Sequence, residues 1–415
     1  MKLLLLLINF LMITPLSAQE KNAQLQSSSK ADTDSLNDKK NHNYFIEQRD
    51  LVDIGLIILH KNLYKRILLA NTQNTKLHVS AAPILEYTLS TGFATGIAAN
   101  GAFQTDQLNT NTSSFLAAIK YTQKKQFLLP IQTSLWTKNN TFNWLGDWRF
   151  LDYPQDTYGI GGNTSEANKS VITYKYIRFY ETVLKNIGNN FYAGLGYQLN
   201  RHWGISETGA PLGQATDFEM YGPDKTTTSS GLYFNLQYDS RKNSINPEGG
   251  AFYANIGYLQ NFRFWGSNTN WNSVSIDIRK YLKMHGENIL AFWFFSMITL
   301  NGNPPYLDLP GTGYDTYNNT GRGYEQGRFI GKKMIDLEAE YRFKITNNGL
   351  VGGVVFANAE SVSEWHTNAF QTIEPAFGAG LRIKINKFSN TNACIDYGIG
   401  RSGSRGFFGN LGEVF

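Results

Sequence analysis

The segment KKMIDLEAEYRFKI, residues 332–345, alternates between apolar and charged side chains along most of its length. Successive side chains of an extended strand point to opposite faces, so a strand here would have two very different faces. The apolar face would consist of Ile335, Leu337, Ala339, Tyr341, Phe343 and Ile345, and the charged face of Asp336, Glu338, Glu340, Arg342 and Lys344. The apolar face requires an apolar environment and the charged face a polar one, and few folds provide both environments to one strand.

The same alternation recurs from about Val79 to Phe415, in segments separated by turn residues. A soluble sandwich would turn the apolar faces inward and leave the polar faces to water. An outer-membrane barrel would turn the apolar faces to lipid and the polar faces to its lumen. The clearest examples of the alternation are TFNWLGDWRF (141–150), GLYFNLQYDSR (231–241), NSVSIDIRKYL (272–282) and FGAGLRIKIN (377–386).

Strand length and aromatic placement favour the barrel. The alternating segments exceed the ~5–6 residues of an ordinary strand and match the ~9–11 residues that cross a membrane. Tyr, Trp and Phe concentrate near the segment ends, where the aromatic girdles of such barrels lie. The segments number about sixteen, and an even number is expected for a barrel of this kind. We therefore predict an all-β fold, a 16-stranded antiparallel transmembrane β-barrel over residues 79–415.

The two most apolar parts of this region also fit strands. NILAFWFFSMITL, residues 288–300, is too short to span a membrane as a helix, so we predict a strand whose lumenal face is packed by another apolar group. GFFGNLGEVF, residues 406–415, is predicted to be the last strand. Phe407, Leu411 and Phe415 would share its outer face as a C-terminal barrel signal, with Phe415 at the membrane interface and Glu413 reaching the headgroups.

Composition narrows the functional classes. Only 17% of the residues are charged, and the net charge of +5 is spread without a basic cluster, which argues against nucleic acid as a partner. Cys394 is the single cysteine, so it forms no internal disulfide, and we expect it to be a small packing residue. The six histidines lie far apart in the sequence. We therefore predict neither a metal site nor a cofactor.

The N-terminal segment MKLLLLLINFLMITPLSAQE has the features of a secretory signal peptide over residues 1–18. The alternative, a membrane anchor, needs ~20 apolar residues and the run is shorter. Residues 19–78 are predicted to be a short periplasmic tether. Within it, residues 50–70 fit a periplasmic or interfacial helix, although Gly55 weakens that interpretation and a buried strand is the rival. The exported chain is expected in the outer membrane of a Gram-negative cell.

Four segments resemble motifs of the BamA/TamA superfamily, the bacterial surface antigen barrels. YDSRKNSINPEGGAFYANIGY (238–258) resembles the strand–turn–strand signature of that superfamily, DTYGIGGNTSE (156–166) a turn of members with little periplasmic domain, GRGYEQGRF (321–329) the sixth-loop motif, and DYGIGRSGSRGFFGNLGEVF (396–415) the closing hairpin. The matching positions are Asp239, Arg241, Pro247 and Gly249 in the first segment, and Arg322, Gly323 and Tyr324 in the third.

The resemblance implies that the sixth extracellular loop, about residues 301–330, folds into the lumen. Its arginine, Arg322, is then expected to pair with Glu340, at the wall position that commonly receives it in the superfamily. Asn358 stands where many members carry a second Asp, so Asp336 or Glu338 is expected to compensate. On this interpretation, the charged face of residues 332–345 supplies carboxylates to the loop.

The resemblance also implies a function. Superfamily members insert or translocate proteins or lipids, but their periplasmic POTRA domains do not fit into residues 19–78. We expect a nearly bare barrel that contacts outer-membrane lipids and works with periplasmic or outer-membrane protein partners. A homodimer is a further alternative. The first alternative is a passive or gated channel. The second, a barrel enzyme that uses His202, His285 or His366, lacks a local triad signature, so we predict no enzymatic activity.

Overall fold

The computed structural model describes residues 48–59, 77–88, 92–105 and 110–415, all within the unit Gln48–Phe415. The predicted signal peptide and most of the predicted tether lie outside the described residues. The strands are β1 (His78–Thr88), β2 (Gly92–Phe103), β3 (Ser113–Thr122), β4 (Phe127–Trp136), β5 (Phe142–Thr157), β6 (Ser170–Gly188), β7 (Phe191–Thr208), β8 (Thr226–Asp239), β9 (Phe252–Asn261), β10 (Trp271–Lys283), β11 (Ile289–Asn301), β12 (Lys333–Lys344), β13 (Val351–Val362), β14 (Glu374–Asn386), β15 (Thr391–Ile399) and β16 (Arg405–Leu411). The α-helices are α3 (Leu51–Ile58) and α5 (Asp217–Tyr221).

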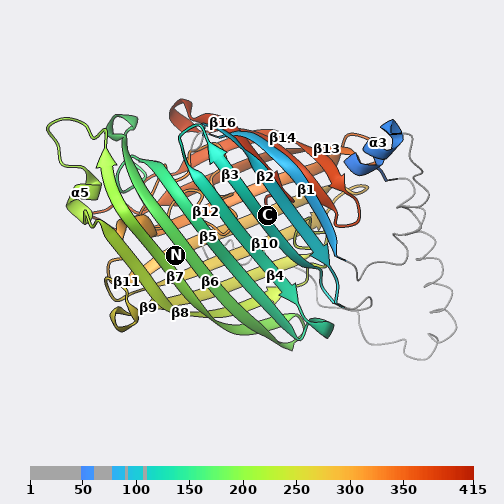
Figure 1. Cartoon of the computed structure of the whole chain (residues 1–415), viewed down its shortest axis with the longest axis horizontal. Helices are drawn as coiled ribbons and strands as arrows, with labels where there is room; N and C mark the ends of the chain where they lie inside the picture. The colour runs from blue at the N-terminus through green and yellow to red at the C-terminus, as the bar shows by residue number, and fades with distance from the viewer. Residues whose placement is uncertain (1–47, 60–76, 89–91, 106–109) are drawn as a thin grey trace. The chain divides into compact units, whose positions relative to one another are not determined.

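Each strand pairs with its neighbours in sequence order, and every pairing is antiparallel. The single sheet curls around on itself (Figure 1). Short turns make this order possible. Between β6 and β7, for example, Asn189 and Asn190 both have positive φ angles, which suits a two-residue hairpin turn. The all-β antiparallel barrel predicted from the alternation is confirmed.

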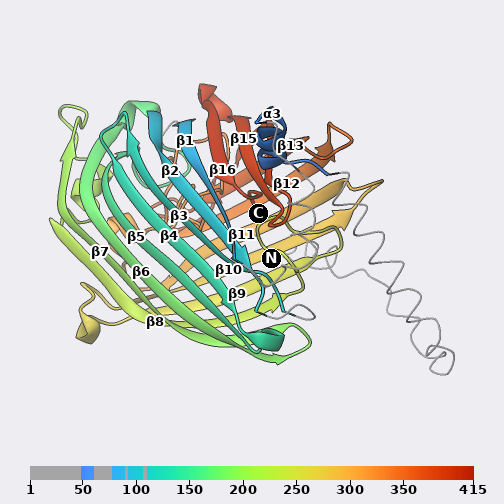
Figure 2. The same cartoon turned by 45° about the vertical axis from the view of Figure 1, so that its right-hand side comes forward.

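The barrel is nearly closed, with an unsealed seam. β1 and β16 lie next to each other (Figure 2), but among the described residues no backbone pairing joins them. β16 spans only seven residues and ends at Leu411, because Gly412 adopts a φ of +91° and turns the chain away. This turn ends β16 after seven residues, so β16 is shorter than the eleven-residue β1 on the other side of the seam.

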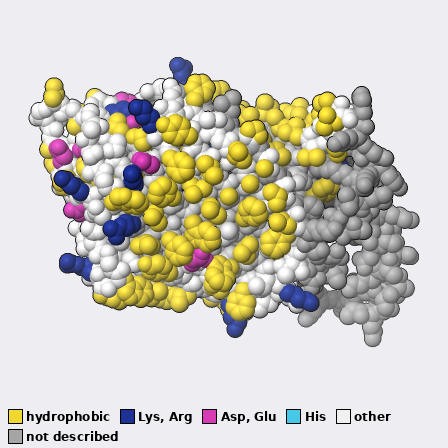
Figure 3. Space-filling view, in the orientation of Figure 1, with side chains coloured by type: hydrophobic (Ala, Val, Ile, Leu, Met, Phe, Trp, Pro, Cys, Tyr) yellow, Lys and Arg dark blue, Asp and Glu magenta, His cyan; other side chains and the backbone are white. Residues whose placement is uncertain are grey.

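Apolar side chains cover the outside of the barrel, and polar side chains line its inside. On β5, Trp144 and Trp148 are exposed while Asp147 and Arg149 are buried. The same division holds on β12, where Leu337 is exposed and Asp336, Glu338, Glu340 and Arg342 of the other face are buried. Figure 3 shows that largely hydrophobic side chains cover the middle of one outer face. A soluble protein has the opposite arrangement, so this exterior requires apolar surroundings.

The apolar segment before the barrel begins as a helix and not as a strand. Asp50 caps α3 by accepting a hydrogen bond from the backbone N–H of Asp53. Residues 60–70 of the predicted helix lie outside the described residues. Neither helix in the described part of the chain is long and apolar enough to cross a membrane.

The predicted position of the C-terminal residues is wrong. Phe407 is exposed on the outer face as expected, and Leu411 ends β16. Beyond Gly412, however, Glu413, Val414 and Phe415 are all buried, and the backbone N–H of Glu413 donates to the carbonyl of Ile245. Because Gly412 breaks the period-2 alternation, Phe415 does not reach a membrane interface and Glu413 does not reach headgroups.

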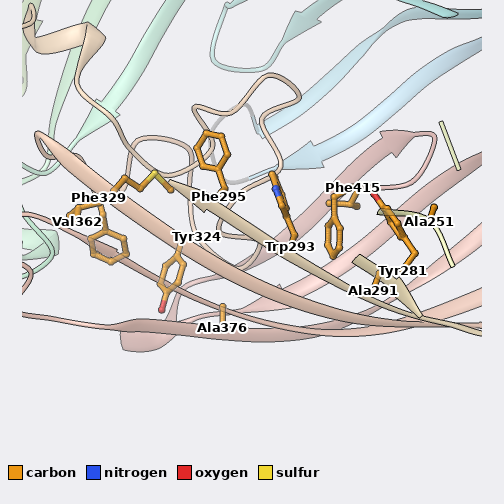
Figure 4. Close-up of a cluster of buried hydrophobic side chains, with 12 residues drawn as sticks. Ala251, Tyr281, Ala291, Trp293, Phe295, Tyr324, Phe329, Val362, Ala376 and Phe415 are labelled. Atoms are coloured by element: carbon orange, nitrogen blue, oxygen red, sulfur yellow. The ribbon is translucent and has the colours of Figure 1, made fainter. Parts of the chain in front are cut away.

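The buried C-terminal residues explain the most apolar strand. On β11, Trp293 and Phe295 face inward and join a buried cluster with Tyr324, Phe329 and Phe415 (Figure 4). The rings of Trp293 and Phe415 lie 5.2 Å apart. The predicted apolar group on the lumenal side of this strand is therefore supplied by the C-terminal residues and by the connection between β11 and β12.

Placing a charge on the outer face should destabilise the barrel in lipid. Phe234, exposed near the middle of β8, is a suitable position. We expect Phe234→Arg to lower the free energy of unfolding in lipid vesicles by ~2–4 kcal/mol, the cost of Arg near a bilayer midplane. Leu212→Arg, in the connection between β7 and β8 and fully exposed, is the control and should change it by less than about 0.5 kcal/mol. Equal effects in a denaturant titration would contradict the lipid-facing assignment.

Candidate functional site: loop 6 and its arginine

Loop 6, residues 302–332, connects β11 to β12 and carries a deeply buried arginine. Arg322 is 2% exposed and forms ion pairs with three carboxylates. Its Nη1 lies 2.7 Å from Asp396 Oδ2, and its Nη2 lies 3.0 Å from Glu338 Oε2 and 2.8 Å from Glu340 Oε2. The ring of Phe356 lies beneath the guanidinium, with its centroid 3.9 Å from Cζ. We call Arg322 and its three carboxylates the arginine site.

The alternation of two strands positions these carboxylates. Glu338 and Glu340 are two residues apart on β12, so both point inward. Asp396 points inward from β15. Burial alone would lower the pKa of Arg322, but the carboxylates of the arginine site raise that pKa above its ordinary value. The guanidinium therefore stays charged, and its fixed fork of donors suits several carboxylates at once.

Two glycines let loop 6 approach the wall closely. Gly323 has a φ of +121°. A Cβ on Gly398 of β15 would lie only 2.8 Å from the backbone nitrogen of Gly323. The Tyr324 hydroxyl donates to the carbonyl of Pro375 at 2.7 Å and accepts from the backbone N–H of Arg401 at 2.9 Å. Residues 322–324 thus contact the barrel wall through the ion pairs of Arg322, the close backbone approach at Gly323 and the hydroxyl of Tyr324.

The structure brings together most of the residues named for the loop. Glu340 and Glu338 both contact Arg322. Asn358 uses its amide to donate to the backbone carbonyl of Arg322 at 2.8 Å, so it binds the motif without a charge. Asp336 is buried on the same face of β12, but no ion pair joins it to Arg322 in the described part of the chain, so of the two residues named as alternatives Glu338 is the one that contacts the arginine.

The sequence analysis missed Asp396 and the network behind it. Asp396 also pairs with Arg382 of β14, and Arg382 Nε lies 2.7 Å from Glu413 Oε2. Arg342 contacts Glu340 at 2.5 Å and donates to the carbonyl oxygen of Phe415. The isolated acidic residue in the apolar segment NACIDYG was the available signal for Asp396. Glu413 carried no such signal, because its inward position depends on the turn at Gly412.

Loop 6 also contacts the opposite wall of the barrel. Arg149 of β5 donates to the carbonyl of Thr316 and, at 2.8 Å, to the side-chain oxygen of Asn318. Asp147 holds Arg149 in place at 2.8 Å. β5 is seven strands from β12 in the sheet order, so residues 316–322 cross the barrel from one wall to the other. The sequence placed Arg149 on the polar face but did not indicate this contact.

A second acidic group of loop 6 lies at the rim of the barrel. Glu325 is buried, with Oε1 3.0 Å from Lys124 Nζ and Oε2 accepting from the Tyr158 hydroxyl at 2.8 Å. Lys124 also pairs with Asp156 at 2.8 Å. Burial and the neighbouring Asp156 carboxylate raise the pKa of Glu325 to about 7. Attachment of the loop at this rim is therefore sensitive to pH near neutrality.

The strand–turn signature lies at the opposite rim. Asp239 and Arg241 form a buried pair with an Nη2–Oδ2 distance of 2.8 Å, and the guanidinium stacks on Tyr253. Pro247 is buried in the following turn, and a Cβ on Gly249 would meet Lys283 at 2.8 Å. Residues of this turn reach distant elements: Asn243 and Asn246 donate to the backbone carbonyls of Ser389 and Asn390, and Ile245 accepts from Glu413.

Between loop 6 and this turn the barrel encloses a cavity of about 730 Å³. Its lining combines aromatic, amide and charged side chains of the wall, including Tyr176, Arg178, Asn235, Tyr253 and Arg279, with residues of loop 6. The three histidines of the enzyme alternative do not meet. His202 is buried and stacks on Tyr176, whereas His285 and His366 are exposed in connections at opposite rims.

Comparisons with known proteins identify the fold. No family model matches the sequence, and no curated protein matches it. Among solved structures, BamA from Haemophilus ducreyi lacking POTRA domains 1–3 is similar with a TM-score of 0.51 and 13% identity, over 81% of this chain and 69% of that chain. CdiB from Escherichia coli is similar with a TM-score of 0.53 and 8% identity, over 80% of this chain and 62% of that chain, which is less than two thirds of its length.

At such low identity the similarity concerns the fold alone. The chain has an outer-membrane β-barrel fold that resembles the BamA and CdiB barrels. An outer-membrane location follows from this fold and from the apolar exterior.

Removing the central cation should release loop 6. We expect Arg322→Ala to destabilise the folded barrel by about 3–5 kcal/mol, because several buried carboxylates lose their partner. Heat-modifiable gel mobility and denaturant titration in lipid would detect the loss. Arg263→Ala, at an exposed arginine in the connection between β9 and β10, should leave both unchanged. Wild-type stability in Arg322→Ala would mean that the arginine site does not hold the loop.

Loop attachment should weaken as pH rises through neutrality. A raised carboxyl pKa means that the attached state binds the proton of Glu325 more tightly than the free state does, so the contribution of Glu325 to attachment is full below the ordinary carboxyl pKa and decreases as pH rises through about 7. Hydrogen exchange of residues 321–328, corrected for intrinsic rates, should therefore be faster at pH 8.5 than at pH 5.5. Glu325→Gln should reduce this difference and Asp224→Asn, at an exposed position of the same rim, should preserve it. The same pH dependence in Glu325→Gln would contradict this assignment.

Proposed function

We propose that this chain inserts or translocates protein or lipid at the outer membrane, together with partner proteins. The observation that carries the proposal is the seam between β1 and β16, where neighbouring strands lack backbone pairing in the described residues. A sheet edge in lipid leaves unsatisfied backbone groups, so it is a place where a substrate strand can pair or where the bilayer is disturbed. The resemblance to the BamA and CdiB folds supports the same class of function.

Loop 6 fits this role as an internal brace near the seam. Its arginine site binds β12 and β15, and β15 pairs directly with the edge strand β16. The same ion-pair network includes Glu413, which follows β16. Release of Arg322 would therefore loosen the strands next to the seam while the rest of the sheet keeps its hydrogen bonds. In this proposal the inward position of the loop keeps the strands beside the seam in the arrangement that a substrate strand needs, so loss of Arg322 lowers activity.

Partner proteins would supply what the barrel lacks. The described residues contain one short helix before β1 and no folded domain that could hold an unfolded substrate. A substrate-delivering protein at the rim opposite loop 6 is therefore part of the proposal. A second copy of the chain remains a candidate partner at the unpaired edge.

Insertion and lipid transfer can be measured directly. Native outer-membrane vesicles from cells that contain or lack the protein would be given an unfolded small barrel protein, with folding followed by gel mobility, and a fluorescent lipid, with transfer followed by quenching. We expect the vesicles that contain the protein to be faster in at least one assay by about tenfold, equal to 1.4 kcal/mol of barrier. Arg322→Ala should remove most of this gain, and Arg263→Ala should not. No gain in either assay would reject the proposal.

The cavity of about 730 Å³ favours a second candidate, a gated outer-membrane channel. The amide and charged side chains in its lining are compatible with passage of water and small solutes, although loop 6 crosses the lumen. Single-channel recordings separate the two functions. Large and stable conductance of the wild-type protein would favour the channel, whereas rare, brief openings would favour a braced barrel.

A further inference from the structure

Helix α3 presents its apolar side away from the protein. Leu51, Val52, Ile57, Ile58 and the C-cap residue Leu59 are between 44% and 71% exposed. The acidic residues Asp50 and Asp53, by contrast, are at most 1% exposed. An amphipathic helix on a soluble surface buries its apolar side and exposes its charges, so α3 has the reverse arrangement.

Buried charges hold the helix in this orientation. Lys387, in the turn between β14 and β15, places its Nζ 2.8 Å from Asp53 Oδ2, and both side chains are 1% exposed. The Asp50 carboxylate accepts a hydrogen bond from the backbone N–H of Lys387 at 2.9 Å. The backbone N–H of Arg49 donates to the carbonyl of Asn348, in the turn between β12 and β13, at 2.9 Å. The start of α3 is thus attached to two turns of the rim opposite loop 6.

This rim also carries the end of the lipid-facing surface. Ile345, directly after β12, and Leu381 on β14 are exposed apolar residues of the outer wall. α3 contacts β14 and lies beside the ends of β13 and β14 in both views (Figures 1 and 2). Its exposed side chains therefore extend the apolar exterior of the barrel at the height where a membrane leaflet ends.

We propose that α3 is an interfacial anchor whose apolar side lies in the headgroup–acyl boundary of the leaflet at this rim. Lipid is the occupant that the observations favour, because the apolar side adjoins the lipid-facing wall, and because the attachment buries an ion pair that keeps this side turned outward. Burying charges is costly, and attachment through the apolar side would have avoided that cost. A helix with large apolar residues on one side, whose acidic side chains are paired with the barrel, is suited to the membrane–water interface. The inference depends on the outer-membrane location and not on the function proposed above.

Depth in the membrane tests the anchor. The full chain, with Cys394→Ala removing the single cysteine, would carry one fluorophore-labelled cysteine at a time and be reconstituted into vesicles containing nitroxide lipids. The positions are Ile58→Cys on α3, Val355→Cys on the exposed outer face of β13, and Asn347→Cys in the exposed turn of the same rim. We expect quenching at position 58 to reach at least half of that at 355 and several times that at 347.

Quenching at position 58 as weak as that at 347 would overturn the proposal, because a side that contacts water, another protein or another segment of the chain is shielded from the lipid quencher. A second variant tests the attachment. Lys387→Gln removes the ion pair with Asp53, so it should lower quenching at position 58 by about half or more while quenching at 355 stays unchanged. Unchanged quenching at 58 in this variant would show that the buried pair does not orient the helix. Gel mobility before each measurement identifies variants that fail to fold.

Discussion

A guanidinium buried among carboxylates organises the interior of this barrel. Removing Arg322 from water carries a desolvation cost, and three ion pairs with Asp396, Glu338 and Glu340 offset it. These partners lie on two strands that are separated by β13 and β14, so the loop cannot satisfy its arginine without contacting the wall at both places. The inward position of residues 321–323 of loop 6 follows from this requirement.

The same network connects loop 6 with the unsealed seam. Asp396 of β15 binds both Arg322 and Arg382, and Arg382 binds Glu413 beyond the end of β16. Charges are shared within one enclosed space, where water screens them less than at a surface. Movement of loop 6 would therefore affect the end of the last strand through ion pairs as well as through backbone hydrogen bonds. The aromatic contact between Trp293 and Phe415 adds an apolar link to the same region.

The two rims of the barrel are stabilised by different kinds of contact. At the loop-6 rim, Glu325 contacts Lys124 and Tyr158, and burial together with the nearby Asp156 raises the pKa of Glu325 to about 7. At the other rim, the turn after β8 crosses toward β14 and β16, and α3 is attached through Lys387. The first arrangement is suited to release, because a proton can change its charge. The second arrangement is suited to a lasting attachment, because the ion pair between Lys387 and Asp53 and the neighbouring backbone hydrogen bonds are buried.

The sequence by itself determined the outer wall and the inner wall, because a period of two assigns every side chain of a strand to one face or the other. The loop arginine was identified in a different way, through the resemblance of residues 321–329 to a superfamily motif. The period of two placed Glu338 and Glu340 on the inner wall, and the resemblance implied that they serve the loop arginine. What only the tertiary structure decided are contacts between segments far apart in the chain: Asp396 with Arg322, Arg149 with loop 6, and Lys387 with α3. Local pattern also failed at Phe415, because one glycine with positive φ ends the alternation. Which inward residues meet across a lumen depends on how the sheet curls, and no single strand carries that information.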